Sequence, residues 1–393
     1  MAENVRFTLP EAVRQVIQRL NDHGYEAYVV GGCVRDMLRN VAPHDYDMCT
    51  SAMPEETKAC FKDHRVIETG IQHGTVTVMV AHEPFEITTY RTEGDYLDGR
   101  HPSSVAFTRN LENDLQRRDF TINAMAYHPE RGLVDLYGGQ KDIENRCLRC
   151  VGDAHTRLTE DALRILRAMR FAAELGFTVE EQTAQAMTDL KNRLSLISRE
   201  RIASELIRMI GGAHAACVIR QFRDIFCAAL PQCRQMDLPA LERAPLGDTV
   251  LRTAALLHPL GAEEAESALH SLKLSTLFTR DCTELIAHYD AVISSADVPL
   301  WLARLGERQF VRLAQLKEAA VRDELLLEMQ RAIDESLPLR LRDLAVNGQD
   351  LIAAGIPAGR QVGETLSALH EKVLKREIAN DQKTLLAALG TLK

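Results

Sequence analysis

The chain has 393 residues, of which 46% are hydrophobic and 26% charged, and its formal net charge is −9. This composition is typical of a globular protein of two to four domains, and without a run of about 18 apolar residues we expect no membrane span. The negative charge argues only weakly against a nucleic-acid partner, because local charge decides contact with phosphates.

The N-terminal part of the chain predicts strands that alternate with helices. The spacing of apolar residues predicts a helix over 11–20, and the apolar run 27–30 predicts a short strand. Gly31 and Gly32 then turn the chain into a second helix that reaches about Asn40.

A second strand is expected around Asp45, after Pro43. Pro54 suits the first turn of a further helix, for which Ser51 is a candidate N-terminal cap. Three more strand-like runs follow at 66–68, 75–80 and 85–90. The region from about 25 to 140 therefore predicts a mixed sheet with few helices.

Two aspartates in this region indicate a cation site. Asp45 and Asp47 are two residues apart, so in a strand both side chains project from one face. Two carboxylates that close repel each other, and a divalent cation with oxygen ligands relieves the repulsion. Glu86, inside an apolar run, is a candidate third acid, and the alternative is a solvated glutamate on an edge strand.

Glycine and arginine residues upstream suit a phosphate. Gly31 and Gly32 follow an expected strand and open an expected helix, the context that favours phosphate binding, and Arg35 adds a positive charge. A glycine pair alone often marks a plain turn. Beside the carboxylates, the combination predicts metal-dependent nucleotidyl transfer.

From about Leu158 onward the pattern is almost wholly helical, with leucine, alanine, arginine and glutamate dominant. We expect the breaks between helices at residues 211–212, 231, 294–299 and 355–359. The residues that suggest chemistry thus lie at the front of the chain, and a helical body follows them.

The nine cysteines are scattered and odd in number, which favours free thiols in a reducing cytoplasm. The N-terminus lacks the layout of a signal peptide, so we expect a cytoplasmic protein. Cys147 and Cys150 form a lone CxxC without the second pair of a usual zinc site.

Five motifs, in order, resemble those of one family. Residues 29–36 (VVGGCVRD) with 45–47 (DYD) resemble the head signature of class II tRNA nucleotidyltransferases, the CCA-adding enzymes, and of bacterial poly(A) polymerases. The other four resemble the second signature, the base-recognition motif, the neck helix and a tail segment of the shorter Bacillus-type enzymes: 117–125 (RRDFTINAM), 160–164 (EDALR), 197–202 (ISRERI) and 345–351 (AVNGQDL).

The resemblance implies an α/β nucleotidyltransferase head with a mixed sheet, followed by an all-α neck, body and tail. The implied segments are a catalytic head at 1–140, a base-recognising neck at 141–212, a body at 213–300 and a tRNA-binding tail at 301–393. The implied reaction adds C, C and A to the 3′ end of tRNA from CTP and ATP with Mg²⁺, releases pyrophosphate, and is carried out by a monomer or homodimer.

Residue roles are carried over from the matching motifs. Asp45 and Asp47 would bind magnesium, and Glu86 would complete the catalytic acids. Seven residues would bind the nucleotide, with Gly32 and Arg35 at the triphosphate, Arg118 at the nucleotide, Asp161 and Arg164 at the base, and Arg167 and Arg170 in support.

The base-reading pair has a simple physical logic. Asp161 accepts hydrogen bonds and Arg164 only donates them. Cytosine and adenine each offer an amino group beside a ring acceptor, whereas uracil and guanine present a carbonyl where the amino group should be. The mismatch leaves buried groups unpaired at about 1–3 kcal/mol each, so C and A could be selected without a template.

Some of these roles have alternatives. On one continuous helix Asp161 and Arg164 are neighbours, but Arg170 lies nearly opposite Asp161, so an ion pair elsewhere in the neck is the alternative for Arg170. Arg117 and Arg118 are adjacent, and one of them could merely pair with Asp119.

Residues 91–107 predict a long flexible loop, either an ordinary surface loop or, by the resemblance, an element that A-competent members carry and CC-only members lack. Related functions stay open: an A-adding or CC-adding partial enzyme, a poly(A) polymerase, a nucleotidyltransferase for a small molecule, or a catalytically silent RNA-binding protein on the same scaffold. The long helical C-terminal half disfavours a small acceptor, and the intact acids disfavour a silent scaffold.

Overall fold

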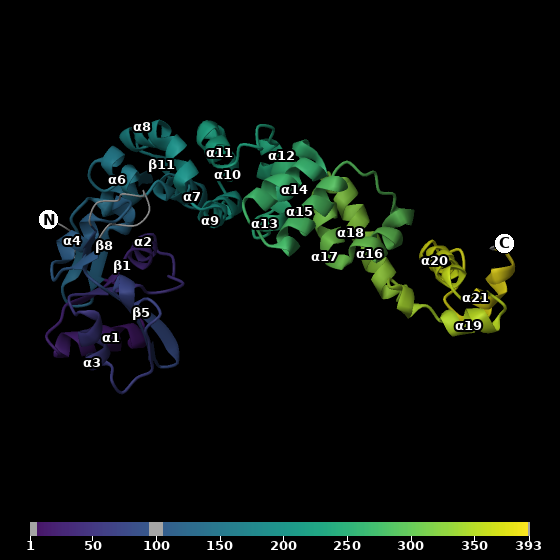
Figure 1. Ribbon diagram of the computed structural model, residues 1–393, viewed down its shortest axis with the longest axis horizontal. Coiled ribbons are helices and arrows are strands. Elements are labelled where there is room, and N and C mark those ends of the chain that lie inside the picture. Colours follow the sequence, from purple (N-terminus) through teal and green to yellow (C-terminus); the bar gives the residue numbers. More distant parts are fainter. Residues whose placement is uncertain (1–5, 94–104, 392–393) are drawn as a thin grey trace. The chain divides into compact units, whose positions relative to one another are not determined.

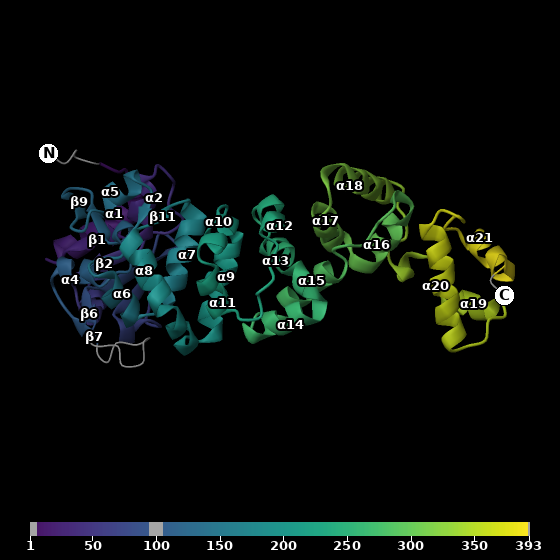
Figure 2. The ribbon, with the colours of Figure 1, turned by 90° about the horizontal axis from the view of Figure 1, so that it is seen from above.

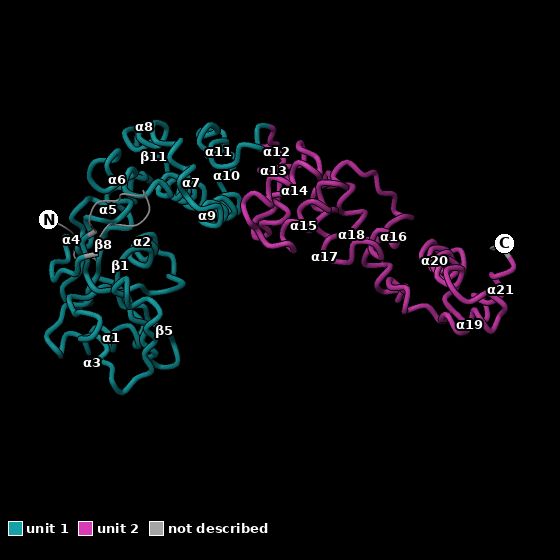
Figure 3. Tube along the Cα trace, in the orientation of Figure 1, with its two compact units in different colours: residues 1–234 teal, residues 235–393 magenta. Residues whose placement is uncertain are grey.

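The computed structural model describes residues 6–93 and 105–391. It divides into two compact units, residues 1–234 and 235–393, which Figure 3 draws in teal and magenta. The first unit contains every residue that the sequence predicts for catalysis or nucleotide binding.

The first unit is built around a seven-stranded mixed sheet with the strand order β3-β4-β5-β2-β1-β8-β9. Its strands are β1 (Ala27–Val30), β2 (Met48–Thr50), β3 (Val66–Ile67), β4 (Thr75–Val80), β5 (Glu83–Thr89), β8 (Met125–His128) and β9 (Gly132–Asp135). Strands β2 and β5 run parallel, and the other neighbours pair antiparallel. The predicted mixed sheet is confirmed.

One face of the sheet packs against α1 (Glu11–Asp22) and α3 (Pro54–Cys60) (Figure 1). The apolar stripe of α1 is buried against Val29 and Ile87, as the helical spacing predicts. The opposite face carries a second apolar cluster around Val30, Cys49 and Leu115. Side chains that alternate along each strand therefore serve two different layers.

Three further helices flank the sheet, namely α2 (Gly32–Leu38), α4 (Leu111–Gln116) and α5 (Gly139–Glu144). Helix α3 begins at Pro54 as predicted, but the predicted cap is wrong. The N-cap residue is Met53, and the hydroxyl of Ser51 instead accepts a hydrogen bond of 2.9 Å from the backbone N–H of Glu26.

A small antiparallel ribbon, β6 (Arg91–Glu93) and β7 (Val105–Phe107), forms the two ends of the predicted loop (Figure 2). A Cβ added at Gly74, which has φ +83°, would lie 2.6 Å from the ring of Phe107. The guanidinium of Arg91 donates to the carbonyl of His73 at 2.6 Å. The ribbon is thus anchored on the turn before β4, and the rest of the predicted loop, residues 94–104, lies outside the described residues.

Helices fill the rest of the first unit, together with a parallel two-stranded ribbon of β10 (Cys147–Leu148) and β11 (Thr178–Val179). The helices are α6 (Ala154–Glu160), α7 (Leu163–Leu175), α8 (Glu181–Leu190), α9 (Arg199–Gly211), α10 (Ala215–Gln221) and α11 (Arg223–Ala229). Helix α7 packs against α9 and α10, and α9 ends at Gly211, where a break was predicted.

The continuous helix assumed for Asp161 to Arg170 is wrong, because α6 and α7 are separate helices. Asp161 has an extended backbone, with φ −138° and ψ 104°, between them. Its carboxylate accepts a hydrogen bond of 3.0 Å from the backbone N–H of Leu163. An aspartate that bonds the backbone two residues ahead offers an alternative to the helical hydrogen bond, which accounts for the break.

The second unit is helical, as predicted for the C-terminal half. Its helices are α12 (Leu238–Arg243), α13 (Thr249–Leu257), α14 (Gly261–Ser271), α15 (Thr276–Ala287), α16 (Val298–Leu305), α17 (Glu307–Gln315), α18 (Ala319–Asp334), α19 (Gly348–Ala353), α20 (Arg360–Leu374) and α21 (Gln382–Ala387). The last three share an apolar core that includes Leu351, Leu369 and Leu385. No helix among the described residues is long and apolar enough to cross a membrane. The four-segment division stays a prediction.

Candidate active site

Asp45 and Asp47 lie in the stretch that leads into β2, not in a strand, so the strand predicted around Asp45 is wrong. Ladder pairing with β1 begins at Met48, and before it the backbone carbonyl of Asp47 accepts one hydrogen bond of 2.9 Å from the N–H of Val30. Both aspartate side chains are exposed. The two carboxylates therefore lie just before the first residue of a central strand, where a ligand can reach them.

The parallel pairing of β2 with β5 brings Glu86 beside the aspartates. Met48 lies opposite Ile87, so Glu86 on β5 corresponds in register to Asp47. Glu86 is exposed, whereas Ile87 on the other face is buried in the core. The sequence-predicted acids are thus neighbours at one edge of the β2 and β5 pair.

The acids influence one another electrostatically. Although Asp47 keeps exposed surface, desolvation by the surrounding protein raises its pKa, the charges of Asp45 and Glu86 raise it further, and Arg118 opposes them. Across residues 6–93 and 105–391, no three His, Cys, Asp or Glu side chains are grouped so as to hold a metal ion by themselves. The aspartate pair nevertheless fits a hard divalent cation, which proteins commonly hold with one or two carboxylates plus substrate phosphates.

The glycine turn lies directly under an arginine. Gly31 has φ +80° and precedes Gly32, the first residue of α2. A Cβ at Gly31 would lie 3.2 Å from Nη1 of Arg118, and one at Gly32 would lie 3.6 Å from Nη2 of Arg35. The absence of side chains lets two guanidinium groups approach the turn closely, an arrangement suited to a polyphosphate.

Arg35 is oriented by three neighbours. Its guanidinium donates to both carboxylate oxygens of Asp36, at 3.0 and 3.1 Å, and to Oδ1 of Asn123 at 2.8 Å. The ring of Phe171 lies 5.3 Å from the guanidinium carbon. These contacts fix Arg35 before any ligand is bound.

Arg117 and Arg118 share one carboxylate, which the sequence reasoning missed. Asp114 accepts from Arg117 at 2.7 Å and from Arg118 at 3.0 Å, and its side chain is fully buried. The alternative that one arginine pairs with Asp119 is wrong, because Asp119 is bound by Arg167. The signal was present in the sequence, since Asp114 precedes the two arginines by three and four residues.

The predicted base-reading residues are both engaged, but not with each other. Oδ2 of Asp161 accepts a hydrogen bond of 2.8 Å from Nη2 of Arg201 on α9. Arg164 is buried, and its Nη1 donates to Oε2 of Glu160 at 2.5 Å. Its Nη2 donates to the backbone carbonyl of Arg117 at 3.1 Å, which joins α7 to the second signature segment.

Arg167 connects the same helix to the sheet domain. Its Nε and Nη2 donate to Oδ2 of Asp119 at 2.8 and 2.7 Å. Burial alone would raise the pKa of Asp119, but the charge and hydrogen bonds of Arg167 outweigh it and lower the pKa to about 2. Asp119 also accepts from Asn123, the partner of Arg35, so one chain of polar contacts runs from α2 to α7.

Arg170 forms an ion pair with other residues of the neck, which is the alternative that the sequence left open to nucleotide binding. Its side chain is almost fully buried, and it donates to Glu205 of α9 at 2.5 Å and to Glu174 at 2.8 Å. The same guanidinium lies 4.0 Å from the centre of the Phe171 ring. Arg170 thus cross-links α7 and α9, and its direct contact with a nucleotide stays a prediction.

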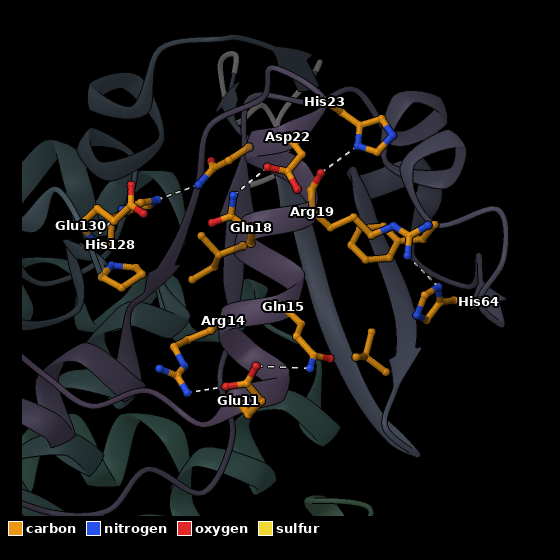
Figure 4. Close-up of a pocket in the computed structure, with 15 residues that line it drawn as sticks. Glu11, Arg14, Gln15, Gln18, Arg19, Asp22, His23, His64, His128 and Glu130 are labelled. Carbon is orange, nitrogen blue, oxygen red and sulfur yellow. Dashed lines mark hydrogen bonds and ion pairs between the residues drawn. The ribbon is translucent and has the colours of Figure 1, made fainter.

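A separate hollow of about 720 Å³ lies along α1 (Figure 4). None of the predicted site residues lines it. Its charged side chains are engaged locally, as in the bond between Arg14 and Glu11 and the bond of 2.6 Å between Gln18 and Asp22. Nothing in its lining indicates chemistry.

Three family models match successive parts of the chain. Residues 27–149 match the Poly A polymerase head domain, which covers the sheet and the predicted acids. Residues 176–225 match the Probable RNA and SrmB-binding site of polymerase A, and residues 250–389 match tRNA nucleotidyltransferase domain 2.

Curated CCA-adding enzymes resemble the chain over almost its whole length. The CCA-adding enzyme of Enterococcus faecalis is 36% identical over 396 residues, which cover 97% of this chain and 96% of the relative. The CCA-adding enzyme of Geobacillus stearothermophilus is 37% identical over 399 residues and covers 95% of each chain.

Solved structures agree with these matches. The Bacillus stearothermophilus CCA-adding enzyme in complex with CTP superposes with a TM-score of 0.86 at 33% identity and covers 98% of both chains. The Thermotoga maritima CCA-adding enzyme complexed with tRNA has the same fold, with a TM-score of 0.71 at 20% identity over 100% of this chain and 97% of its own.

Proposed function

This chain belongs to the CCA-adding enzymes and is a tRNA nucleotidyltransferase, and we propose that it adds C, C and A in turn to the 3′ end of tRNA from CTP and ATP, with release of pyrophosphate. The observation that carries the proposal is the meeting of the Asp45 and Asp47 acids with the Gly31 turn and Arg118 in one place.

The acids suit a metal-dependent transfer. We assign Asp45 and Asp47 as the ligands of Mg²⁺, with Glu86 beside them as the third acid. When bound, the metal would lower the pKa of the attacking 3′ hydroxyl and stabilise the leaving pyrophosphate. The pKa of Asp47 is raised first by desolvation and then by the charges of Asp45 and Glu86, and a bound cation would offset both effects.

The phosphates would lie over the glycine turn. Gly32 leaves room for them, while Arg35 and Arg118 supply donors from two sides. Guanidinium groups bind phosphate oxygens with charge-assisted, often paired hydrogen bonds. Because Arg35 and Arg118 are already held by carboxylates, little side-chain freedom would be lost on binding.

The base would be read at the junction of α6 and α7. An ionised carboxylate has about four acceptor positions, so Asp161 can accept from a base amino group while it stays bonded to Leu163 and Arg201. Arg164 would donate to the ring acceptor of the base. Arg167 lies one helical turn further along α7, and Arg170 holds α7 against α9. One fixed donor and acceptor pair would then accept cytosine and adenine alike and reject uracil and guanine.

We assign the helical second unit to the tRNA body, which it would grip through phosphate contacts. The experiment that tests the whole proposal is incorporation on a purified tRNA that ends before its CCA, with magnesium and CTP alone, ATP alone or both. Two C residues with CTP, then a single A when ATP is added, are expected.

Other products would show that the chain has a related activity. Addition of A only, of C only or of a long A tail would identify a partial enzyme or a poly(A) polymerase. Binding of tRNA without any incorporation would identify a silent RNA-binding protein and would overturn the proposal.

A further inference from the structure

A buried carboxylate stands between the two arginines of the second signature. Asp114 on α4 has no exposed surface, and it accepts from Nε and Nη2 of Arg117, at 3.0 and 2.7 Å, and from Nη2 of Arg118, at 3.0 Å. It also accepts a longer hydrogen bond of 3.4 Å from the backbone N–H of Arg91, the first residue of β6. One carboxylate thus joins two adjacent cations and the start of the ribbon.

The contact with Asp114 decides which edge of Arg118 faces the ligand site. Nη2 is taken by Asp114, whereas Nη1 lies over the Gly31 turn. Nε of Arg118 is buried and finds no hydrogen-bond partner among the described residues. The positive charge of Arg118 also opposes the rise in the pKa of Asp47. The guanidinium is therefore held through Nη2, and this contact leaves Nη1 over the Gly31 turn.

Charge makes this arrangement depend on Asp114. Arg117 and Arg118 are neighbouring cations, and the buried carboxylate of Asp114, which both contact, offsets the repulsion between them. Burial by itself would raise the pKa of Asp114, but the charges of Arg118 and Arg117 hold it below its ordinary value. The carboxylate is thus ionised, and it attracts both guanidinium groups.

We propose that Asp114 is a positioning residue for the nucleotide, and that it acts by directing the guanidinium of Arg118 over the Gly31 turn toward the triphosphate. The proposal rests on the assignment of that turn to nucleotide binding. A helix-surface ion pair at this spacing would be exposed and of little consequence, whereas Asp114 is fully buried.

The test is equilibrium binding of CTP in the presence of magnesium, measured by isothermal titration calorimetry on the full chain. We expect Asp114→Asn to weaken binding by about tenfold, because the charge-assisted contacts that hold Arg118 are lost. Asp281→Asn is the matched control, since it also removes a buried aspartate from an arginine, Arg312, but in the second unit. The control should keep the wild-type dissociation constant.

A double-mutant cycle separates positioning from stability. If Asp114 acts through Arg118, Asp114→Asn should weaken CTP binding no further in an Arg118→Ala background. Additive losses, or a wild-type dissociation constant in Asp114→Asn, would overturn the proposal. Should Asp114→Asn not fold, Asp114→Glu keeps the charge but shifts the carboxylate by one methylene; weaker CTP binding supports the proposal and unchanged binding overturns it.

The result is distinguishable from a failure of the proposed function. A wild-type chain that adds no nucleotide to tRNA would contradict the function, whereas the binding of CTP would still report on Asp114. A chain that adds C, C and A normally and whose Asp114→Asn variant binds CTP like the wild type would contradict only the positioning role.

Discussion

Oδ2 of Asp161 and Nη2 of Arg201 are 2.8 Å apart, so the carboxylate predicted to read the base is held by the neck helix α9 and not by its sequence neighbour Arg164. The acceptor is thereby fixed in one orientation relative to two elements. A rigid acceptor discriminates between donors and acceptors on a base better than a mobile one.

Base choice should depend on this carboxylate. We expect Asp161→Ala to raise incorporation of U and G relative to C by roughly tenfold to a hundredfold, because their carbonyl groups no longer face an acceptor. The measurement is the ratio of kcat/KM values for the four nucleotides on tRNA. Gln185→Ala, an exposed change on α8, should leave the ratios as they are, and unchanged rejection of UTP and GTP in Asp161→Ala would contradict the base-reading role.

Asp45→Ala should abolish incorporation without unfolding the protein. Asp45 is exposed, so the free energy of unfolding should change by no more than about 0.5 kcal/mol, while the oxygen ligand for the metal is lost. Incorporation and urea unfolding are measured together. Asp22→Ala, which removes another exposed aspartate of the same unit, should keep full activity. Residual activity in Asp45→Ala would contradict the assignment of Asp45 as a metal ligand.

The buried pair of Arg170 and Glu205 should contribute to stability. We expect Glu205→Ala to lower the free energy of unfolding by about 1 to 3 kcal/mol, because it removes one of the two carboxylates that hold a buried cation and Glu174 still offsets part of the charge. Denaturant unfolding measures the loss. The double change Arg170→Met with Glu205→Leu should recover much of it, since no charge is then left buried; a double variant as unstable as the single one would show that the pair acts through packing instead.

Acid stability should depend on Asp119. Its pKa is lowered to about 2 in the fold, so its ionised form stabilises the protein above its unfolded pKa, and this stability is lost as pH falls through the folded value. The contribution is about 2 kcal/mol. We expect Asp119→Asn to unfold more easily at neutral pH and to lose less additional stability between about pH 4 and about pH 2. Parallel pH profiles for variant and wild type would contradict this.

Two glycines with similar backbones should respond differently to alanine. Gly74 and Gly138 have φ of +83° and +76°, but only at Gly74 would the new Cβ meet another group, the ring of Phe107. Both variants bear the backbone strain of about 1 to 2 kcal/mol, and Gly74→Ala should be less stable than Gly138→Ala because Phe107 must also move. Thermal unfolding of the pair gives the difference, and equal losses would mean that the ribbon is not anchored at Gly74.

The sequence predicts what depends on local periodicity and misses what depends on distant partners. The stripe of α1 and the strands β4 and β5 follow directly from apolar spacing. By contrast, residues 160–164 hold no glycine or proline that signals a helix break; the local bond from Leu163 to Asp161 makes the break, and Arg201 on α9 holds the same carboxylate from a distant part of the chain. Tertiary hydrogen bonds of this kind override local propensity.

The charged site shows the same limit. Residue types and order single out the acids, the glycine turn and the arginines as candidates, and their roles stay predictions. The helical spacing of Asp114 from Arg117 and Arg118 signals that pairing, whereas only the fold assigns Asp119 to Arg167. Partners that come from another helix, such as Glu205, leave no mark at the positions that they bind.

The contacts between the sheet and α7 also decide where this chain can be divided into fragments. A fragment that ended near residue 140 would lack β10 and β11 and would leave Asp119 without Arg167 and the carbonyl of Arg117 without Arg164. Residues 1–234 keep all of these partners in one piece. A minimal nucleotide-binding fragment should therefore end beyond α11, because a shorter head would lose the partners of Asp119 and of the Arg117 carbonyl and would be less stable.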